Sequence, residues 1–270
     1  MGGRMATALI TGATAGIGHA FARRLAADGH DLVLVARDYE RLERTAKELH
    51  EQYGIDADVL VADLVEDEGL ELVEARLRDR DRPIDMLINN AGFSVNRRFI
   101  RGDIEGEERM LRILVLAVMR LTHAALPGMI DRGHGGIINV SSVAAFIPQG
   151  TYSAHKAWVN SFSRSIATDL AGTGVAVLVL CPGFTRTEFH ERAAIDMSKM
   201  PRYMWLEADL VVDQGLKALS KDAIVCVPGP QYKVIATIAR FFPVRALSRY
   251  SARFRGARRS TDSRSSVRPR

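Results

Sequence analysis

The sequence has little cysteine and no metal-ligand motif. Cys181 and Cys226 are the two cysteines of the chain, and both lie in apolar runs. Their number and spacing provide neither a disulfide framework nor a metal site. We therefore interpret both as buried thiols of a protein in a reducing compartment, and we expect no bound metal.

The sequence also has few long apolar runs. The opening stretch MGGRMATALITGATAG has a short apolar segment interrupted by glycines, which is not a secretory signal. No window is apolar enough for long enough to span a membrane. The composition, with 47% hydrophobic and 26% charged residues, is that of a soluble globular domain. These features predict a cytoplasmic protein.

Positive charge is scarce in the body of the chain and concentrated at its end. The whole chain carries +5, whereas residues 240–270 contain ten arginines, no lysine and one acid, a net +9. The 239 preceding residues therefore carry −4. No motif that reads or stacks on bases accompanies the basic end, so we expect no nucleic-acid partner.

Short apolar runs alternate with helix-like segments along most of the chain. The runs are apolar on both faces, as in strands at the centre of a covered parallel sheet. Regular alternation of strand and helix predicts an α/β fold with a doubly wound parallel sheet of about seven strands and helices on both faces. The expected strands are 7–11, 31–36, 58–62, 85–90, 136–141, 175–181 and 223–227.

A glycine-rich stretch, TGATAGIG at 11–18, lies directly between the first strand and the first helix. Glycine permits a tight turn and a close backbone approach, and the start of the helix offers free N–H groups to a pyrophosphate. This position favours a dinucleotide site over a bare turn, although the spacing is one residue longer than the common fingerprint.

The end of the second strand indicates which dinucleotide is bound. An acid there suits the ribose 2′-hydroxyl of NAD, whereas an arginine suits the 2′-phosphate of NADP. The chain has Arg37 immediately after the strand, followed by Asp38. We therefore favour NADP(H) over NAD(H). The alternative is that Arg37 is a solvated loop residue and Asp38 caps the next helix.

Six motifs in order give the chain a family resemblance over about residues 5 to 230. Besides TGATAGIG they are DL (63–64), NNAG (89–92), NVSS (139–142), YSAHK (152–156) and PGFTRT (182–187). With these motifs the chain resembles the short-chain dehydrogenase/reductase family. The resemblance implies a Rossmann-type sheet of seven strands, in agreement with the strand count.

The resemblance also implies the residues that bind the cofactor. Asp63 would bind the adenine amino group, and Thr187 would hold the nicotinamide carboxamide. The complete expected set is Gly12, Thr14, Gly16, Ile17, Gly18, Arg37, Asp63, Leu64, Asn90, Ala91, Gly92, Tyr152, Lys156, Pro182, Gly183, Thr185 and Thr187.

Tyr152 and Lys156 are spaced for one face of a helix. Reduction of a ketone needs a hydride on carbon and a proton on oxygen. A free tyrosine, with a pKa of about 10, holds its proton too tightly, and a neighbouring ammonium lowers that pKa. The resemblance makes Tyr152 the general acid/base, Lys156 its partner and Ser142 the group that polarises the substrate oxygen. The alternative is a helix-face anchor beside a solvated lysine.

Two departures from the family pattern stand out. The family places its serine about thirteen residues before the tyrosine, whereas Ser142 precedes Tyr152 by ten. We interpret this as a shortened loop, with Ser141 as the second choice. Leu114 occupies the place of an asparagine whose backbone holds a water in many members. Since a backbone carbonyl remains there, we expect activity to survive.

The loops after the fourth, fifth and sixth strands carry many aromatic residues, which suggests an apolar pocket. The substrate is therefore expected to be a small hydrophobic ketone, aldehyde or alcohol. About half of these side chains would be core residues in the alternative interpretation. The expected pocket residues are Phe93, Phe146, Ile147, Phe184, Phe189 and Trp205.

The C-terminal part is expected to be separate from the catalytic domain, which we place at 1–229. Residues 230–256 have the pattern of a basic amphipathic helix, and the Arg/Ser-rich segment 257–270 is typical of a disordered tail. We hypothesise peripheral membrane contact through this helix. The alternatives are that it covers the substrate pocket or joins a subunit interface.

Three functions compete on these observations. The first is an NADP(H)-dependent oxidoreductase that acts on CH–OH and C=O groups. The second is a dinucleotide-binding sensor or scaffold with little turnover, suggested by Leu114 and the shortened loop. The third is a membrane adaptor built around the basic tail. The resemblance further implies a homodimer or homotetramer through the long helices near 103–130 and 152–171.

Overall fold

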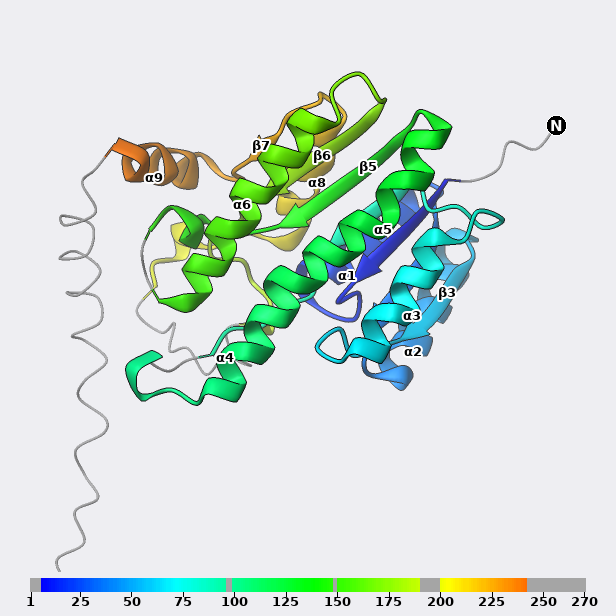
Figure 1. Cartoon of the computed structure of the whole chain (residues 1–270), viewed down its shortest axis with the longest axis horizontal. Helices are drawn as coiled ribbons and strands as arrows, with labels where there is room; N and C mark the ends of the chain where they lie inside the picture. Colours follow the sequence, from blue (N-terminus) through cyan, green and yellow to red (C-terminus); the bar gives the residue numbers. More distant parts are fainter. Residues whose placement is uncertain (1–5, 96–98, 148–149, 190–199, 242–270) are drawn as a thin grey trace, which may run out of the picture.

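A parallel sheet of seven strands forms the centre of the computed structural model, which describes residues 6–95, 99–147, 150–189 and 200–241 (Figure 1). The strand order is β3-β2-β1-β4-β5-β6-β7, and every neighbouring pair is parallel. The predicted α/β, doubly wound fold is therefore confirmed. The strands are β1 (Thr7–Thr11), β2 (Asp31–Ala36), β3 (Ala57–Val61), β4 (Met86–Asn89), β5 (Gly135–Val140), β6 (Val175–Leu180) and β7 (Val225–Cys226).

Helices cover both faces of the sheet. Alternate residues of the central strands enter two separate core clusters: Ile10 and Leu34 face α1, α2 and α8, while Leu9 and Val33 face α3 and α5. Figure 1 shows α3, α5 and α6 in front of the sheet. The helices are α1 (Gly16–Ala27), α2 (Tyr39–Tyr53), α3 (Asp67–Arg78), α4 (Ile104–Leu111), α5 (Ala117–Arg132), α6 (Thr151–Asp169), α8 (Ala208–Leu219) and α9 (Pro230–Phe241), with a π-helix η2 (Arg112–Leu116) and 3₁₀ turns η1 (Phe99–Arg101), η3 (Val143–Phe146) and η4 (Arg202–Met204).

The elements α4, η2 and α5 form one continuous helix of 29 residues, Ile104–Arg132. Its length and its mean hydropathy of 1.7 over 18 residues would let it cross a bilayer, so the expectation of no such window was wrong. The apolarity has a cause within the fold. Leu121, Ala124 and Met129 belong to the core cluster between this helix and the sheet.

Helix α9 packs with the sheet domain instead of standing apart from it. Tyr232, Ala236 and Ala239 are buried, and Tyr232 belongs to the core cluster of the α1 face. The remainder of the expected basic helix, 242–256, and the tail 257–270 lie outside the described residues. The division of the chain at residue 229 stays a prediction.

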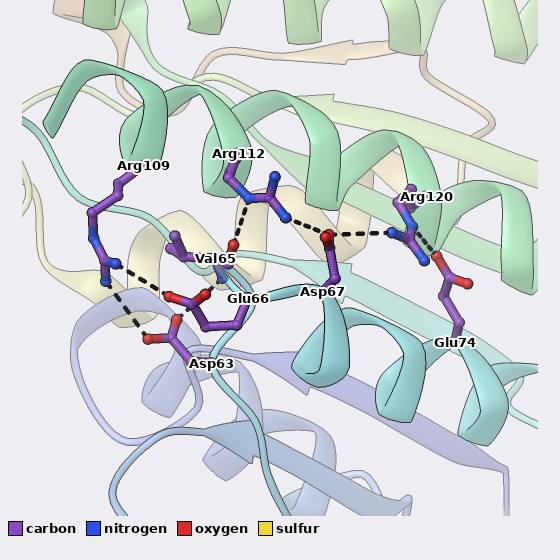
Figure 2. Close-up of polar contacts among 8 residues, drawn as sticks. All are labelled: Asp63, Val65, Glu66, Asp67, Glu74, Arg109, Arg112 and Arg120. Atoms are coloured by element: carbon purple, nitrogen blue, oxygen red, sulfur yellow. Dashed lines mark hydrogen bonds and ion pairs between the residues drawn. The ribbon is translucent and has the colours of Figure 1, made fainter. Parts of the chain in front are cut away.

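A ladder of ion pairs joins the long helix to α3 and to the loop before it (Figure 2). Arg109, Arg112 and Arg120 of the long helix face acids from the other side. Glu74 is the most buried of these acids, with a side chain only 6% exposed, and it receives bonds from Arg120 and, at 2.8 Å, from Arg78. The other pairs are Arg109–Glu66, Arg109–Asp63, Arg112–Asp67 and Arg120–Asp67.

We expect Glu74→Ala to lower the free energy of unfolding by about 1–3 kcal/mol, because it leaves Arg120 without its nearest acceptor. The hydrogen bond from Arg120 is the main cause that holds the pKa of Glu74 below its usual value. The stabilisation is therefore present above the unfolded pKa of about 4.3 and is lost as the pH falls through the folded pKa. Urea unfolding at pH 7 measures the difference.

Glu71→Ala is the matched control, since Glu71 is an exposed acid on the same helix. Its removal is expected to change the free energy by no more than about 0.5 kcal/mol. Equal losses in the two variants would contradict a special role for Glu74.

Candidate active site

The nucleotide loop between β1 and α1 has the backbone geometry that its glycines were expected to provide. Gly12 and Gly16 have positive φ values of +68° and +56°. Gly18 has no room for a side chain, because a Cβ there would lie 2.2 Å from the Gly12 carbonyl oxygen. The start of α1 is thus drawn close to the end of β1. Thr14 lies in this loop, and Ile17 lies in the first turn of α1.

Thr11 and Asn90 lock the ends of β1 and β4 together. The Thr11 hydroxyl accepts hydrogen bonds from the N–H groups of Asn90 and Ala91, at 2.9 and 3.0 Å. The Asn90 side-chain amide donates to the carbonyls of Thr11 and Gly12, at 2.9 and 3.3 Å. Asn90 and Ala91 therefore lie against the nucleotide loop.

Arg37 lies at the open end of the nucleotide region. Its side chain is 68% exposed, and its Nη1 is 3.7 Å from the Asp63 carboxylate. Asp38 accepts a bond from the Arg41 N–H and so caps α2, as the alternative interpretation expected. Leu64 is buried beside Asp63. An arginine and an acid that follow β2 and β3 thus face each other.

Tyr152 and Lys156 lie on the first two turns of α6, against the end of β5. Tyr152 is hydrogen-bonded to the side chain of Ser142. The Lys156 ammonium donates to the Val140 carbonyl at 2.7 Å and lies 5.8 Å from the centre of the Tyr152 ring. The structure therefore brings the three predicted catalytic side chains together.

Burial moves the two pKa values of this pair in opposite directions. Desolvation raises the pKa of Tyr152 to about 12, although the bond to Ser142 opposes the shift. Desolvation lowers the pKa of Lys156 to about 8, and the nearby Cys181 opposes that shift. At neutral pH the phenol is therefore protonated, and the ammonium is close to its titration point.

The two serines at the end of β5 have different positions. Ser141 is buried and donates to the backbone carbonyl of Lys156 at 2.9 Å, which fixes α6 to the sheet. Ser142 faces Tyr152 and accepts a bond from the Ala144 N–H at 3.1 Å. The geometry around Ser142 thus fits the shortened Ser-Tyr spacing, because η3 begins directly after it.

Leu114 lies in the π-helical turn η2, where it is almost fully buried. A π-turn inserted into an α-helix is often associated with a functional site. The Leu114 side chain packs so closely on Gly92 that a Cβ there would lie 2.6 Å from its Cδ2. The helix distortion is therefore present with leucine at this position, and a side chain at residue 92 would displace the end of that leucine.

The PGFTRT segment after β6 packs onto the nucleotide loop. The Pro182 carbonyl accepts a bond from the Val143 N–H at 2.9 Å, and the buried Thr185 pairs with Leu206. Thr187 covers Gly16, where an added Cβ would lie 2.9 Å from the threonine Cβ. This segment therefore lies directly against the nucleotide loop, as its contact with Gly16 shows.

The expected pocket residues lie in different surroundings. Phe189 lies beside Tyr152, with ring centres 6.0 Å apart, whereas Phe146 and Phe184 pack partly against core clusters. Phe93 and Ile147 are half-buried. The structure places Trp205 near Phe184, at 6.2 Å between ring centres.

Sequence reasoning missed Tyr232 of α9. Its hydroxyl accepts a bond from the Phe184 N–H at 3.0 Å, and its ring fills the space where a Cβ on Gly183 would lie. None of the six sequence motifs includes this residue. The amphipathic pattern of 230–256 was the one available signal, and covering the substrate pocket was one of the alternatives that it left open.

Comparison with known proteins assigns the chain to a family. The profile of the family described as short chain dehydrogenase matches residues 6–197. A short-chain dehydrogenase from Sphingobium yanoikuyae, solved in complex with NADPH, is 35% identical, with a TM-score of 0.80 over 98% of this chain and 100% of that one. The chain therefore belongs to the short-chain dehydrogenases/reductases, a family of oxidoreductases.

Two further similarities bear on chemistry. The NADP-dependent 3-hydroxy acid dehydrogenase of Salmonella typhi is 38% identical over 188 residues, which cover 67% of this chain and 73% of that protein. The bulky-bulky ketone specific alcohol dehydrogenase of Comamonas testosteroni is 28% identical, with a TM-score of 0.75 over 98% of each chain.

The shifted pKa of Lys156 predicts the pH dependence of carbonyl reduction. Below about pH 8 the ammonium is charged and the rate is constant; above it the ammonium loses its proton, and kcat falls about tenfold per pH unit. Tyr152 remains protonated over this range. The measurement is kcat between pH 5.5 and 10 at saturating cofactor.

Lys156→Arg provides the comparison, since a guanidinium stays charged throughout this range. Its profile is expected to lack the fall near pH 8. A wild-type profile that stays flat up to pH 10 would contradict the assignment.

Proposed function

We propose that the protein is an NADP(H)-dependent oxidoreductase that interconverts a hydrophobic ketone or aldehyde and its alcohol. The observation that carries this proposal is the contact of Tyr152 with Ser142 beside the buried Lys156, at the edge of the sheet that also holds the nucleotide loop.

The three side chains have distinct roles in this reaction. Ser142 donates to the substrate carbonyl oxygen and fixes its position. Tyr152, neutral at pH 7, gives its proton to that oxygen during reduction and takes it back during oxidation. The positive charge of Lys156 stabilises the phenolate left on Tyr152. NADPH, when bound, supplies the hydride.

The nucleotide loop supports a dinucleotide as the cofactor. Its glycines draw the start of α1 close to the end of β1, and the N–H groups at the start of a helix suit a pyrophosphate. The exposed guanidinium of Arg37 is suited to the 2′-phosphate. NADP(H) is also the cofactor named for two of the similar proteins.

The proposed substrate is apolar. Phe189 lies directly beside Tyr152, and half-buried Phe93 and Ile147 come from neighbouring loops. The similarity to an alcohol dehydrogenase specific for bulky ketones agrees with this substrate class. We further propose a homodimer or homotetramer in the reducing cytoplasm.

A fluorescence titration with NADPH and NADH tests the cofactor. We expect NADPH to bind at least about tenfold more tightly, and Arg37→Ala to remove that preference, because its charged contact to the 2′-phosphate is lost. A preference for NADH would contradict the role of Arg37.

The same titration with Tyr152→Phe separates an enzyme from a sensor. This variant is expected to keep its cofactor affinity within a factor of about two, while the reduction of apolar ketones falls at least about 100-fold. Equal turnover of wild type and variant on all ketones would favour the dinucleotide-binding sensor or scaffold.

We also propose peripheral membrane contact through the C-terminal segment. Val234 and Ile238, one turn apart on α9, are 57% and 48% exposed. The chain beyond them, residues 242–270, has nine arginines and one acid. An apolar patch followed by concentrated positive charge suits the surface of an anionic membrane.

Vesicle co-sedimentation tests this contact. The full chain is expected to pellet with phosphatidylserine vesicles and to remain in solution with neutral vesicles, whereas a chain that ends at Phe241 pellets with neither. Truncation there keeps Tyr232, which anchors α9. Equal pelleting of the two chains would remove the hypothesis.

A further inference from the structure

An ion pair connects α2 with the segment after β6, across 147 residues of sequence. The Arg41 Nη2 donates to one carboxylate oxygen of Glu188 at 2.9 Å, and Nη1 donates to the other at 3.4 Å. Both side chains are partly exposed, at 34% and 45%. The two-point contact fixes the orientation of the carboxylate as well as its distance.

Arg41 holds the nucleotide loop at the same time. Its Nη2 also donates to the Thr14 carbonyl at 3.2 Å. Beside this contact, Thr187 packs against Gly16. One guanidinium therefore ties the loop after β1 to the residue that follows Thr187, and so joins the nucleotide loop to the segment after β6.

The charges at this place matter for an anionic ligand. A pyrophosphate at the start of α1 would lie close to both the nucleotide loop and the 184–189 segment. Without Arg41, the Glu188 carboxylate would repel it, so the pairing allows an acidic residue to approach the nucleotide loop. Arg37, in contrast, has its nearest carboxylate oxygen, from Asp63, at 3.7 Å and stays 68% exposed. The two arginines of RDYER thus have different positions and different tasks.

We propose that Arg41 and Glu188 form a strap that keeps the 184–189 segment closed over the nucleotide loop and slows the release of NADP(H). Both are positioning residues, since they act through the nucleotide loop and the 184–189 segment. That the released ligand is NADP(H) rests on the proposed function. The contact between Arg41 and Glu188 does not depend on it.

Stopped-flow measurement of NADPH binding and release tests the strap. Glu188→Gln and Arg41→Gln are each expected to raise the dissociation rate about 3- to 10-fold, with association rates within about twofold of wild type. The double variant is expected to release NADPH no faster than the faster single variant, because both changes break one contact.

Glu207→Gln is the matched control. It removes another exposed ion pair of the same segment, Arg186–Glu207 at 2.9 Å, which does not involve the nucleotide loop. Its dissociation rate is expected to equal that of wild type. An equal rise in this control would mean that any loosening of the segment has the same effect, and would overturn the specific role of Arg41.

Hydrogen exchange of the cofactor-free protein gives a second readout. Peptides covering 12–18 and 184–189 are expected to exchange faster in both strap variants and unchanged in Glu207→Gln. Unchanged exchange, additive effects in the double variant, or tighter NADPH binding by Glu188→Gln would each overturn the proposal. If the wild-type protein binds no dinucleotide and the two strap variants still exchange faster than wild type, the strap is supported and the proposed function is rejected.

Discussion

The hydrogen bonds between Thr11 and Asn90 are the constraint on which the rest of the site depends. They join β1 to β4 at the point where the strand order of the sheet reverses, and ligands of doubly wound folds bind there. With these ends fixed, the glycine loop can fold back over the start of α1. The neighbouring strand β5 ends shortly before Ser142, and the next strand, β6, leads into the 182–187 segment.

Burial shifts the pKa values of Tyr152 and Lys156 in opposite directions, and the expected lowering of the tyrosine pKa by the ammonium is not found. Exclusion of water disfavours the charged form of each residue, so the tyrosine becomes a weaker acid and the lysine a stronger one. The Val140 carbonyl offsets part of the cost for the ammonium. Ser141 contributes indirectly by fastening the backbone of Lys156, and the sheet thereby sets the orientation of the first turns of α6.

Local patterns made most of the fold predictable. Short runs such as DLVLVA are strands because both of their faces are covered, and the glycines of TGATAGIG mark a turn that only they can make. Contacts between distant segments left no such pattern. Arg41 and Glu188 are far apart in sequence, Tyr232 is a single aromatic residue, and the apolarity of Ile104–Arg132 reflects core packing that composition cannot distinguish from a membrane span.

Tyr232 gives the C-terminal helix a mechanical connection to the substrate side of the molecule. Its ring occupies the space over Gly183, and its hydroxyl holds the backbone of Phe184. A displacement of α9 would therefore move the backbone of Gly183 and Phe184, at the start of the segment that carries Thr187, without any contact between Tyr232 and the catalytic residues.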